Sequence, residues 1–198
     1  MLGGYFALQH YLEYRQTADV DAWWRGAPER AALDAAREEF AKTAAAFGYG
    51  VRERTWGETT SLDALDTDRR TVFSFQVASR SVELAAPIPS PWGGLLIETL
   101  DDNLGAKMNA LVARGAPRDF VDIKAAVDGQ LTTIDRLWAL WRAKNPGLAD
   151  ADARLAVRHR LASLIARTPL DALPAERRDD AAALRAWFRD VFTEESPS

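Results

Sequence analysis

Cysteine is absent from the 198-residue sequence, and histidine occurs only twice, at His10 and His159. A chain without cysteine can form neither a disulfide nor a thiolate metal site. Two histidines also argue against a multi-histidine zinc site. We therefore expect any catalytic metal to be held by oxygen ligands, which favours Mg²⁺ or Mn²⁺.

Long hydrophobic runs and a basic N-terminal segment are also missing. Residues 1–4 lack the positive charge with which a signal peptide begins. The longest uncharged run, residues 84–97, contains three prolines and two glycines, so it cannot cross a membrane as a helix. We expect a cytoplasmic protein without a membrane partner. The net charge of −4 argues against a broadly basic nucleic-acid surface but permits a local basic groove.

The pattern of hydrophobic residues changes near residue 98. Before it, the periodicity predicts both helices and strands, and after residue 99 it predicts helices only. The predicted helices cover 4–15, 28–47, 99–114, 117–128, 132–144, 149–165 and 177–192. The predicted strands cover 18–24, 49–56, 71–77 and 80–86, with a turn over 62–70 and a loop over 87–94. We therefore expect an α+β fold with a mixed sheet core over residues 1–98 and a helical lobe over 99–198.

Two carboxylates stand two positions apart in the segment Asp19-Val20-Asp21. On a strand, residues i and i+2 share one face, so Asp19 and Asp21 are expected to project side by side. Adjacent carboxylates repel each other unless a cation lies between them. The pair is consistent with a divalent-metal clamp for phosphoryl or nucleotidyl transfer. A pair of this kind also occurs on solvated strand edges, and that alternative stays open.

Gly3 and Gly4 precede the first predicted helix. A glycine-rich turn at the start of a helix can present backbone N–H groups to phosphate, although it can equally be a simple turn. Glu83 lies among hydrophobic residues on the predicted strand 80–86. It could face solvent, or it could act as a general base or a third metal ligand.

A second group of polar residues lies in the helical half. Lys107, Leu111 and Arg114 share one helix face, and Arg118, Asp119 and Asp122 follow on the next predicted helix, which begins at Pro117. One interpretation is a pair of helices held together by ion pairs. The other places Lys107 on a triphosphate as a mobile point charge, with Asp119 orienting Lys107 or the sugar.

Four arginines lie on the predicted helix 149–165 or just after it: Arg154, Arg158, Arg160 and Arg167. They could form part of an RNA groove, but a solvated helix face is the simpler interpretation. Trp138 and Trp141 are spaced for one hydrophobic helix face, which predicts core packing.

Together these segments resemble the AbiEii-type nucleotidyltransferase toxins, a branch of the DNA polymerase β-like superfamily. The matching residues are Gly3-Gly4, Asp19-x-Asp21, Lys107-x-x-Ala110-Leu111-x-x-Arg114 and Arg118-Asp119-x-x-Asp122-Ile123. The likeness covers residues 2–125. It implies a nucleotidyltransferase-fold core with a helical C-terminal lobe that completes the active site.

The resemblance also implies roles for individual residues. Asp19 and Asp21 would bind Mg²⁺ or Mn²⁺, and Asp119 would be a further acid of the site. Glu83 is a candidate catalytic acid from its own pattern and has no part in the resemblance. The NTP would be bound by Gly3, Gly4, Lys107 and Arg118. Members of this family act as toxins paired with an antitoxin, and some transfer nucleotides to RNA, notably tRNA.

Two other functions remain open from the residues alone. The chain could transfer a nucleotide to a small molecule, which would require an enclosed acidic pocket. It could also be a catalytically inactive binding module that keeps the fold. Tyr5 favours the inactive module, because the family usually carries serine or threonine there.

Overall fold

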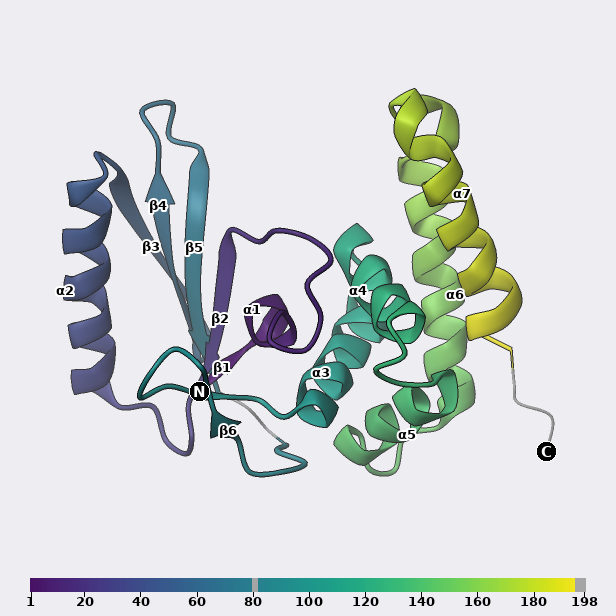
Figure 1. The fold of residues 1–198 in the computed structure, drawn as a ribbon, viewed down its shortest axis with the longest axis horizontal. Helices are drawn as coiled ribbons and strands as arrows, with labels where there is room; N and C mark the ends of the chain where they lie inside the picture. Colours follow the sequence, from purple (N-terminus) through teal and green to yellow (C-terminus); the bar gives the residue numbers. More distant parts are fainter. Residues whose placement is uncertain (80–81, 195–198) are drawn as a thin grey trace. The chain divides into compact units, whose positions relative to one another are not determined.

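The computed structural model describes residues 1–79 and 82–194. The chain divides into two compact units, Met1–Leu100 and Asp101–Ser198, each with its own secondary structure. The first unit contains a mixed β-sheet and two helices, and the second is helical (Figure 1). The fold is therefore of the α+β class.

The sheet of the first unit has seven strands in the order β3-β4-β5-β2-β1-β7-β6. The strands are β1 (Leu2–Gly3), β2 (Asp19–Trp23), β3 (Gly50–Trp56), β4 (Thr59–Leu65), β5 (Thr71–Ala78), β6 (Ile88–Pro89) and β7 (Leu96–Ile97). β2 runs parallel to β5 and antiparallel to β1. Strands β3, β4 and β5 form an antiparallel meander, so β2 lies at the centre of a mixed sheet.

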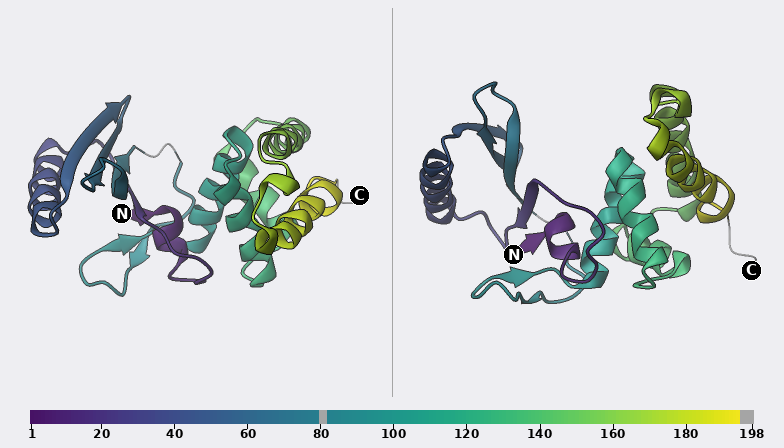
Figure 2. Two further views of the ribbon diagram at one scale, coloured as in Figure 1. Left: turned by 90° about the horizontal axis from the view of Figure 1, so that it is seen from above. Right: turned by 45° about the horizontal axis from the view of Figure 1, so that its top comes forward.

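The long helix α2 (Arg30–Ala46) lies along β3 and β4 (Figures 1 and 2). Arg37 of α2 forms an ion pair with Glu53 of β3, and the Phe40 ring stacks at 6.1 Å from Phe73 of β5. Residues opposite each other in a sheet point to the same side, and Phe73 lies in one row with Ala64 and Val51. α2 therefore covers the sheet face that carries the odd-numbered residues of β3.

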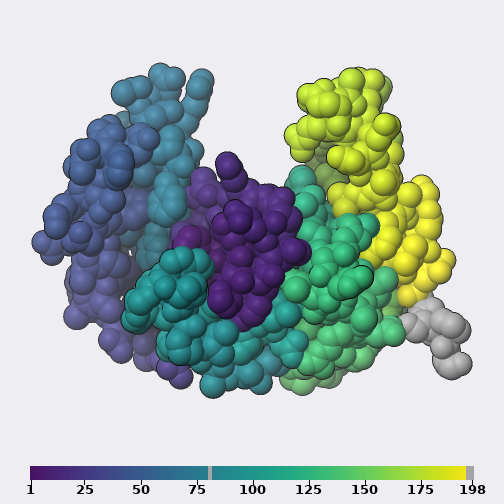
Figure 3. Space-filling model, in the orientation of Figure 1, coloured from purple at the N-terminus to yellow at the C-terminus, as the bar shows by residue number. Residues whose placement is uncertain are grey.

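The short helix α1 (Gly4–Leu8) packs against β1 and β2. Phe6 of α1 lies with its ring 4.6 Å from that of Trp92, in the segment between β6 and β7. In Figure 3 this segment, in teal, lies directly against the purple α1 segment. The β6–β7 segment thus packs against α1.

The second unit consists of α3 (Leu100–Ala113), α4 (Pro117–Asp128), α5 (Ile134–Lys144), α6 (Asp150–Arg167) and α7 (Arg178–Trp187), with the short helices η1 (Leu170–Ala172), η2 (Ala175–Arg177) and η3 (Phe188–Phe192). Phe120, Phe188 and Trp138 are fully buried at its centre. The prediction that Trp138 and Trp141 pack in the core is confirmed, since both are at most 4% exposed. No helix among residues 1–79 and 82–194 is long and apolar enough to span a membrane.

Three predicted elements differ from the structure. The first four residues of the predicted turn over 62–70 belong to strand β4, in which Ser61 to Leu65 are buried on both faces, and the turn itself is confined to residues 66–70. The predicted strand 80–86 is not formed over its described residues, 82–86. The predicted helix 4–15 ends at Leu8. Tyr5 explains this last difference, because its hydroxyl bonds to the backbone of Arg15, which a continuous helix would place about 15 Å away.

Candidate functional site

The centre of the candidate site is the contact between the glycine pair and β2. Gly3 of β1 lies opposite Asp21 of β2 in the antiparallel pairing. The chain then turns at Gly4, which has a φ of 61°, into helix α1. A β-carbon built on Gly4 would lie 2.0 Å from Oδ2 of Asp21. Only glycine therefore fits at this position, both for its backbone angle and for its closeness to a carboxylate.

Gly3 is constrained in a similar way by other side chains. A β-carbon there would lie 2.0 Å from the indole nitrogen of Trp23 and 2.7 Å from a carboxylate oxygen of Glu98. Glu98 is fully buried. Its backbone carbonyl accepts a hydrogen bond of 3.0 Å from the Tyr11 hydroxyl. Burial, followed by the charge of Glu98, raises the pKa of Tyr11, so this phenol stays protonated as the donor.

Asp19 and Asp21 lie on β2 and share one face of the sheet, as the sequence predicted. Both are half-buried. Their neighbours across the parallel pairing are Ser74 and Gln76 of β5, which are polar but uncharged. The two carboxylates are therefore flanked by oxygen- and amide-bearing side chains.

Asp19 and Asp21 are too few to form a metal site made of protein ligands alone, but they suit a magnesium ion that binds together with a nucleotide. Among residues 1–79 and 82–194, no group of three or more histidine, cysteine or acidic side chains is arranged to hold a metal. Mg²⁺ commonly binds through one or two carboxylates together with substrate phosphates and water. Asp19 and Asp21 fit that requirement, since each can offer carboxylate oxygens to an ion that arrives with a nucleotide.

Tyr5 does not lie in the way of a ligand at the glycine pair. Its side chain is 3% exposed, and its hydroxyl donates to the Arg15 carbonyl and accepts from the Arg15 N–H at 3.0 Å. The Arg15 guanidinium lies 3.8 Å from the centre of the Tyr5 ring. Tyr5 therefore anchors the loop that leads into Asp19, and the structure gives it a packing role.

Glu83 lies apart from the position that the sequence predicted for it. It is exposed in the loop between β5 and β6 rather than on a central strand. The catalytic role of Glu83 was predicted from a central strand, and the structure does not place Glu83 on one. The physical reason is that its described neighbours, residues 82–87, form no strand, and the next strand, β6, begins at Ile88.

In the second unit, Lys107 of α3 forms an ion pair with Asp122 of α4. The distance between Nζ and Oδ2 is 2.6 Å, and the Asp122 side chain is fully buried. Lys107 is 11% exposed. The sequence predicted that Asp119 orients either Lys107 or the sugar; in the structure the acid paired with Lys107 is Asp122.

Asp119 instead accepts hydrogen bonds at the start of α4. Its carboxylate accepts two hydrogen bonds of 2.9 Å from Arg114 and a third of 2.9 Å from the backbone N–H of Ala116. Ala116 is the residue that caps α4, so Asp119 satisfies a helix-end donor and benefits from the helix dipole. Arg118 lies exposed on the same turn.

The arginines of α6 are used to hold the chain's own backbone. Arg154 donates to the carbonyls of Phe192 and Glu194, and its guanidinium lies 4.4 Å from the Trp138 ring. Arg158 donates to Thr193, and Arg160 donates to the Ala113 carbonyl. These contacts give Arg154, Arg158 and Arg160 a structural role within the second unit, which favours the simpler interpretation.

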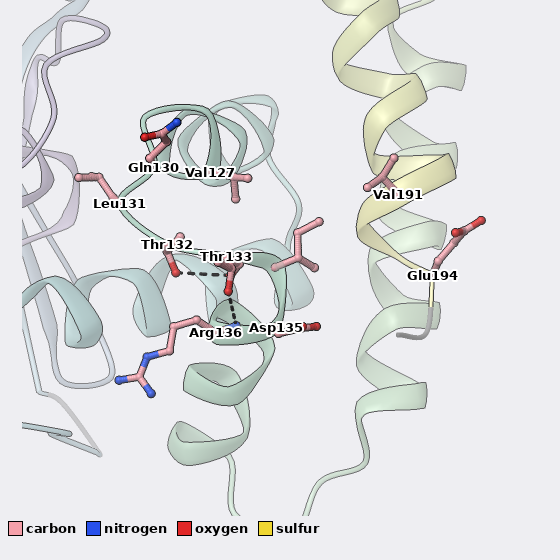
Figure 4. Close-up of a pocket in the computed structure, with 10 residues that line it drawn as sticks. Val127, Gln130, Leu131, Thr132, Thr133, Asp135, Arg136, Val191 and Glu194 are labelled. Carbon is pink, nitrogen blue, oxygen red and sulfur yellow. Dashed lines mark hydrogen bonds between the residues drawn. The ribbon is translucent and has the colours of Figure 1, made fainter. Parts of the chain in front are cut away.

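The second unit also has an open hollow of about 840 Å³ between the α4–α5 loop and η3. Figure 4 shows Thr132, Thr133 and Arg136 on one side of it and Val191 and Glu194 on the other. The charge of Arg136 is paired with Asp101. None of the predicted site residues lines this hollow.

Comparison with known proteins supports the fold only. No protein-family model matches the chain, and no curated protein matches its sequence. Among solved structures, the chain is similar to JHP933 from Helicobacter pylori, with a TM-score of 0.51 and 15% sequence identity. The match covers 96% of this chain and 82% of that one. At this identity the likeness concerns the fold and carries no function.

Two features of the structure were not found from the sequence. One is the partnership of Lys107 with Asp122, which the three-residue spacing of Asp119 and Asp122 made possible but did not decide. The other is a buried cluster around Asp63 on β4, which receives Arg52 and Arg54 from β3. The alternation Arg52-Glu53-Arg54 was a signal for it, since on a strand both arginines must share a face.

Proposed function

We propose that this chain is a metal-dependent nucleotidyltransferase, which moves a nucleoside monophosphate from an NTP to an acceptor, and that the acceptor is RNA. The observation that carries the proposal is the contact between Gly4 and Asp21. A turn that only glycine can make lies beside one of two carboxylates that share a strand face, as a site for a nucleotide and its metal ion requires.

In this proposal each residue has a separate task. Asp19 and Asp21 hold Mg²⁺ or Mn²⁺, and the ion when bound supplies positive charge that neutralises the phosphate oxygens. The turn at Gly3 and Gly4 lets the backbone approach the nucleotide phosphates without a side chain in between. Lys107 serves the triphosphate as a cation whose position is fixed by Asp122.

The biological setting follows from the family resemblance alone. The proposal is that the chain acts in the cytoplasm as the toxin of a toxin–antitoxin or abortive-infection system. A cognate antitoxin would then be its protein partner. Of the possible acceptors, tRNA is the one that the resemblance favours.

The direct test is labelling of total RNA by the purified protein. The protein is incubated with each α-³²P-labelled NTP in turn, together with Mg²⁺ or Mn²⁺, and the RNA is separated on a denaturing gel. The proposal predicts labelling with at least one NTP and none after addition of EDTA. Labelling of a small molecule instead of RNA would show that the acceptor is a small molecule and would contradict the choice of RNA.

An inactive module would give a different result. It would show neither labelling nor, in calorimetry with Mg²⁺ present, binding of any of the four NTPs. That outcome would contradict the proposal as a whole rather than its choice of acceptor.

A further inference from the structure

One face of the first unit's sheet is polar across four neighbouring strands. The pairing places Arg52, Asp63, Ser74 and Asp19 in one row and Arg54, Ser61, Gln76 and Asp21 in the next. Residues paired across a sheet point to the same side. We call these eight residues, together with Trp56, the polar face. It lies on the opposite side of the sheet from α2, which pairs with Glu53 between the two arginines.

Asp63 is the buried centre of this face. Its side chain is fully buried, while those of Arg52 and Arg54 are 42% and 53% exposed. Arg52 donates to Asp63 from Nε at 3.1 Å and from Nη2 at 2.9 Å, and Arg54 lies 3.0 Å from the same carboxylate through Nη2. Burial acts to raise the pKa of Asp63, but hydrogen bonds from Ser74, the arginines and Ser61 lower it overall. One carboxylate therefore fixes two guanidinium groups, and a net positive charge remains.

The two arginines keep donors that the fold does not use. A guanidinium carries five N–H donors. Arg52 donates hydrogen bonds from Nε and Nη2 to Asp63, and from Nη2 also to Thr71. Arg54 donates only from Nη2, also to Asp63. Within residues 1–79 and 82–194, Nη1 of Arg52 and both Nε and Nη1 of Arg54 have no hydrogen-bond partner. Fixed guanidinium groups with free donors are suited to phosphate.

An aromatic ring extends the same face. Trp56 is 48% exposed and stands two positions after Arg54 on β3, with the Arg54 guanidinium 5.8 Å from its ring. A half-exposed indole beside guanidinium groups is the arrangement on which an unpaired nucleic-acid base stacks. Phosphate donors and a stacking ring thus lie on one strand.

We propose that Arg52, Arg54 and Trp56 form a binding surface for a single-stranded RNA segment, which crosses the sheet toward Asp19 and Asp21. The direction rests on the proposed function, because it assumes that transfer takes place at the two carboxylates. Strand β3 is separated from β2 by three interstrand steps, about 14 Å. A stacked strand with a rise of about 3.4 Å per nucleotide covers this span in about four nucleotides.

The experiment measures binding of a fluorescein-labelled single-stranded RNA of about 12 nucleotides to the full chain by fluorescence anisotropy. Trp56→Ala should raise the Kd by roughly fivefold to a hundredfold. Arg54→Gln should raise the Kd and lower the slope of log Kd against log salt by about 0.7. Arg52 still holds Asp63 in this variant, so the fold should be kept, and thermal unfolding checks it.

Two control variants match these changes outside the polar face. Arg30→Gln removes the same charge from α2, where its guanidinium lies exposed. Phe47→Ala removes an exposed aromatic ring from the turn before β3. Both should bind the RNA as the wild type does. Duplex RNA of the same length should bind without sensitivity to Trp56→Ala, because its bases are already stacked.

Equal affinity of Trp56→Ala, Arg54→Gln and wild type for the single strand would overturn the inference. So would a wild type that binds NTP with Mg²⁺ but binds no RNA at about 50 mM salt. Failure of the proposed function is distinguishable from either result, since the wild type would then bind RNA through this surface but bind no NTP.

Discussion

Gly4 is restricted to glycine both by its positive φ and by the Asp21 carboxylate beside it. An alanine there adopts a left-handed backbone at a cost of about 1–2 kcal/mol, and its β-carbon collides with the Asp21 carboxylate. We expect Gly4→Ala to lower the free energy of unfolding, measured in urea, by clearly more than Gly48→Ala. Gly48 is a matched control, because its φ is 75° and a β-carbon there meets nothing within 4 Å. Equal losses in the two variants would show that the contact with Asp21 has no energetic weight.

The lowered pKa of Asp63 predicts how the free energy of unfolding depends on pH. Its pKa in the folded protein lies below the ordinary value of 3.8. Its contribution is therefore complete above about pH 4, where the unfolded chain has lost its proton, and it disappears as the pH falls through the lower folded value. We expect the unfolding free energy to fall less between about pH 5 and pH 3 in Asp63→Asn than in the wild type. Parallel profiles would contradict this account.

At the scale of elements, α3 and α4 are joined by the buried ion pair of Lys107 and Asp122. Removal of one partner alone leaves the other charge buried and costs about 3–5 kcal/mol, which would confuse folding with ligand binding. The double variant Lys107→Met with Asp122→Leu removes both charges and avoids this. Since a charge-assisted bond contributes roughly 1.5–3 kcal/mol, we expect it to weaken NTP binding by about tenfold to a hundredfold with little change in stability. Calorimetry that finds wild-type affinity in a folded double variant would remove Lys107 from the site.

The elements that could be predicted from the sequence are those with a local signal. The alternation of residues 18–24 gave β2, and with it the shared face of Asp19 and Asp21. The helices after residue 99 follow from their periodicity and from signals such as Pro117 at the start of α4. Strand β4 could not be predicted in this way, because Asp63 interrupts its apolar pattern and is stabilised mainly by side chains from the neighbouring strands, the arginines of β3 and Ser74 of β5.

The candidate site shows the same division. The glycine pair and the two aspartates lie within a short stretch of chain, so their proximity required only one turn and one strand pairing. The choice between Asp119 and Asp122 depended on which acid faces α3, and this is set by the packing of two helices. Glu83 was misplaced because a short apolar segment resembles a strand when its neighbours in the sheet are unknown.

At the scale of the whole molecule, the predicted site residues are distributed over both units. The glycines, Asp19 and Asp21 belong to Met1–Leu100, and Lys107, Arg118 and Asp119 belong to Asp101–Ser198. The chain carries a net charge of −4, so an RNA acceptor needs a local cationic surface. Arg52 and Arg54 offer one in the same unit as the two aspartates, whereas the arginines of α6 belong to the other unit.

The measurement that tests the central claim most directly compares wild type, Asp21→Asn and the exposed control Asp68→Asn for RNA labelling and for melting temperature. Asp21→Asn keeps the shape of the side chain but removes one of two neighbouring charges. The account predicts that its transfer is lost while its melting temperature is unchanged or higher, because a repulsion is relieved; Asp68→Asn should match the wild type in both. Transfer at the wild-type rate by Asp21→Asn, or its unfolding at temperatures where the control is folded, would show that the aspartate pair does not bind a catalytic metal.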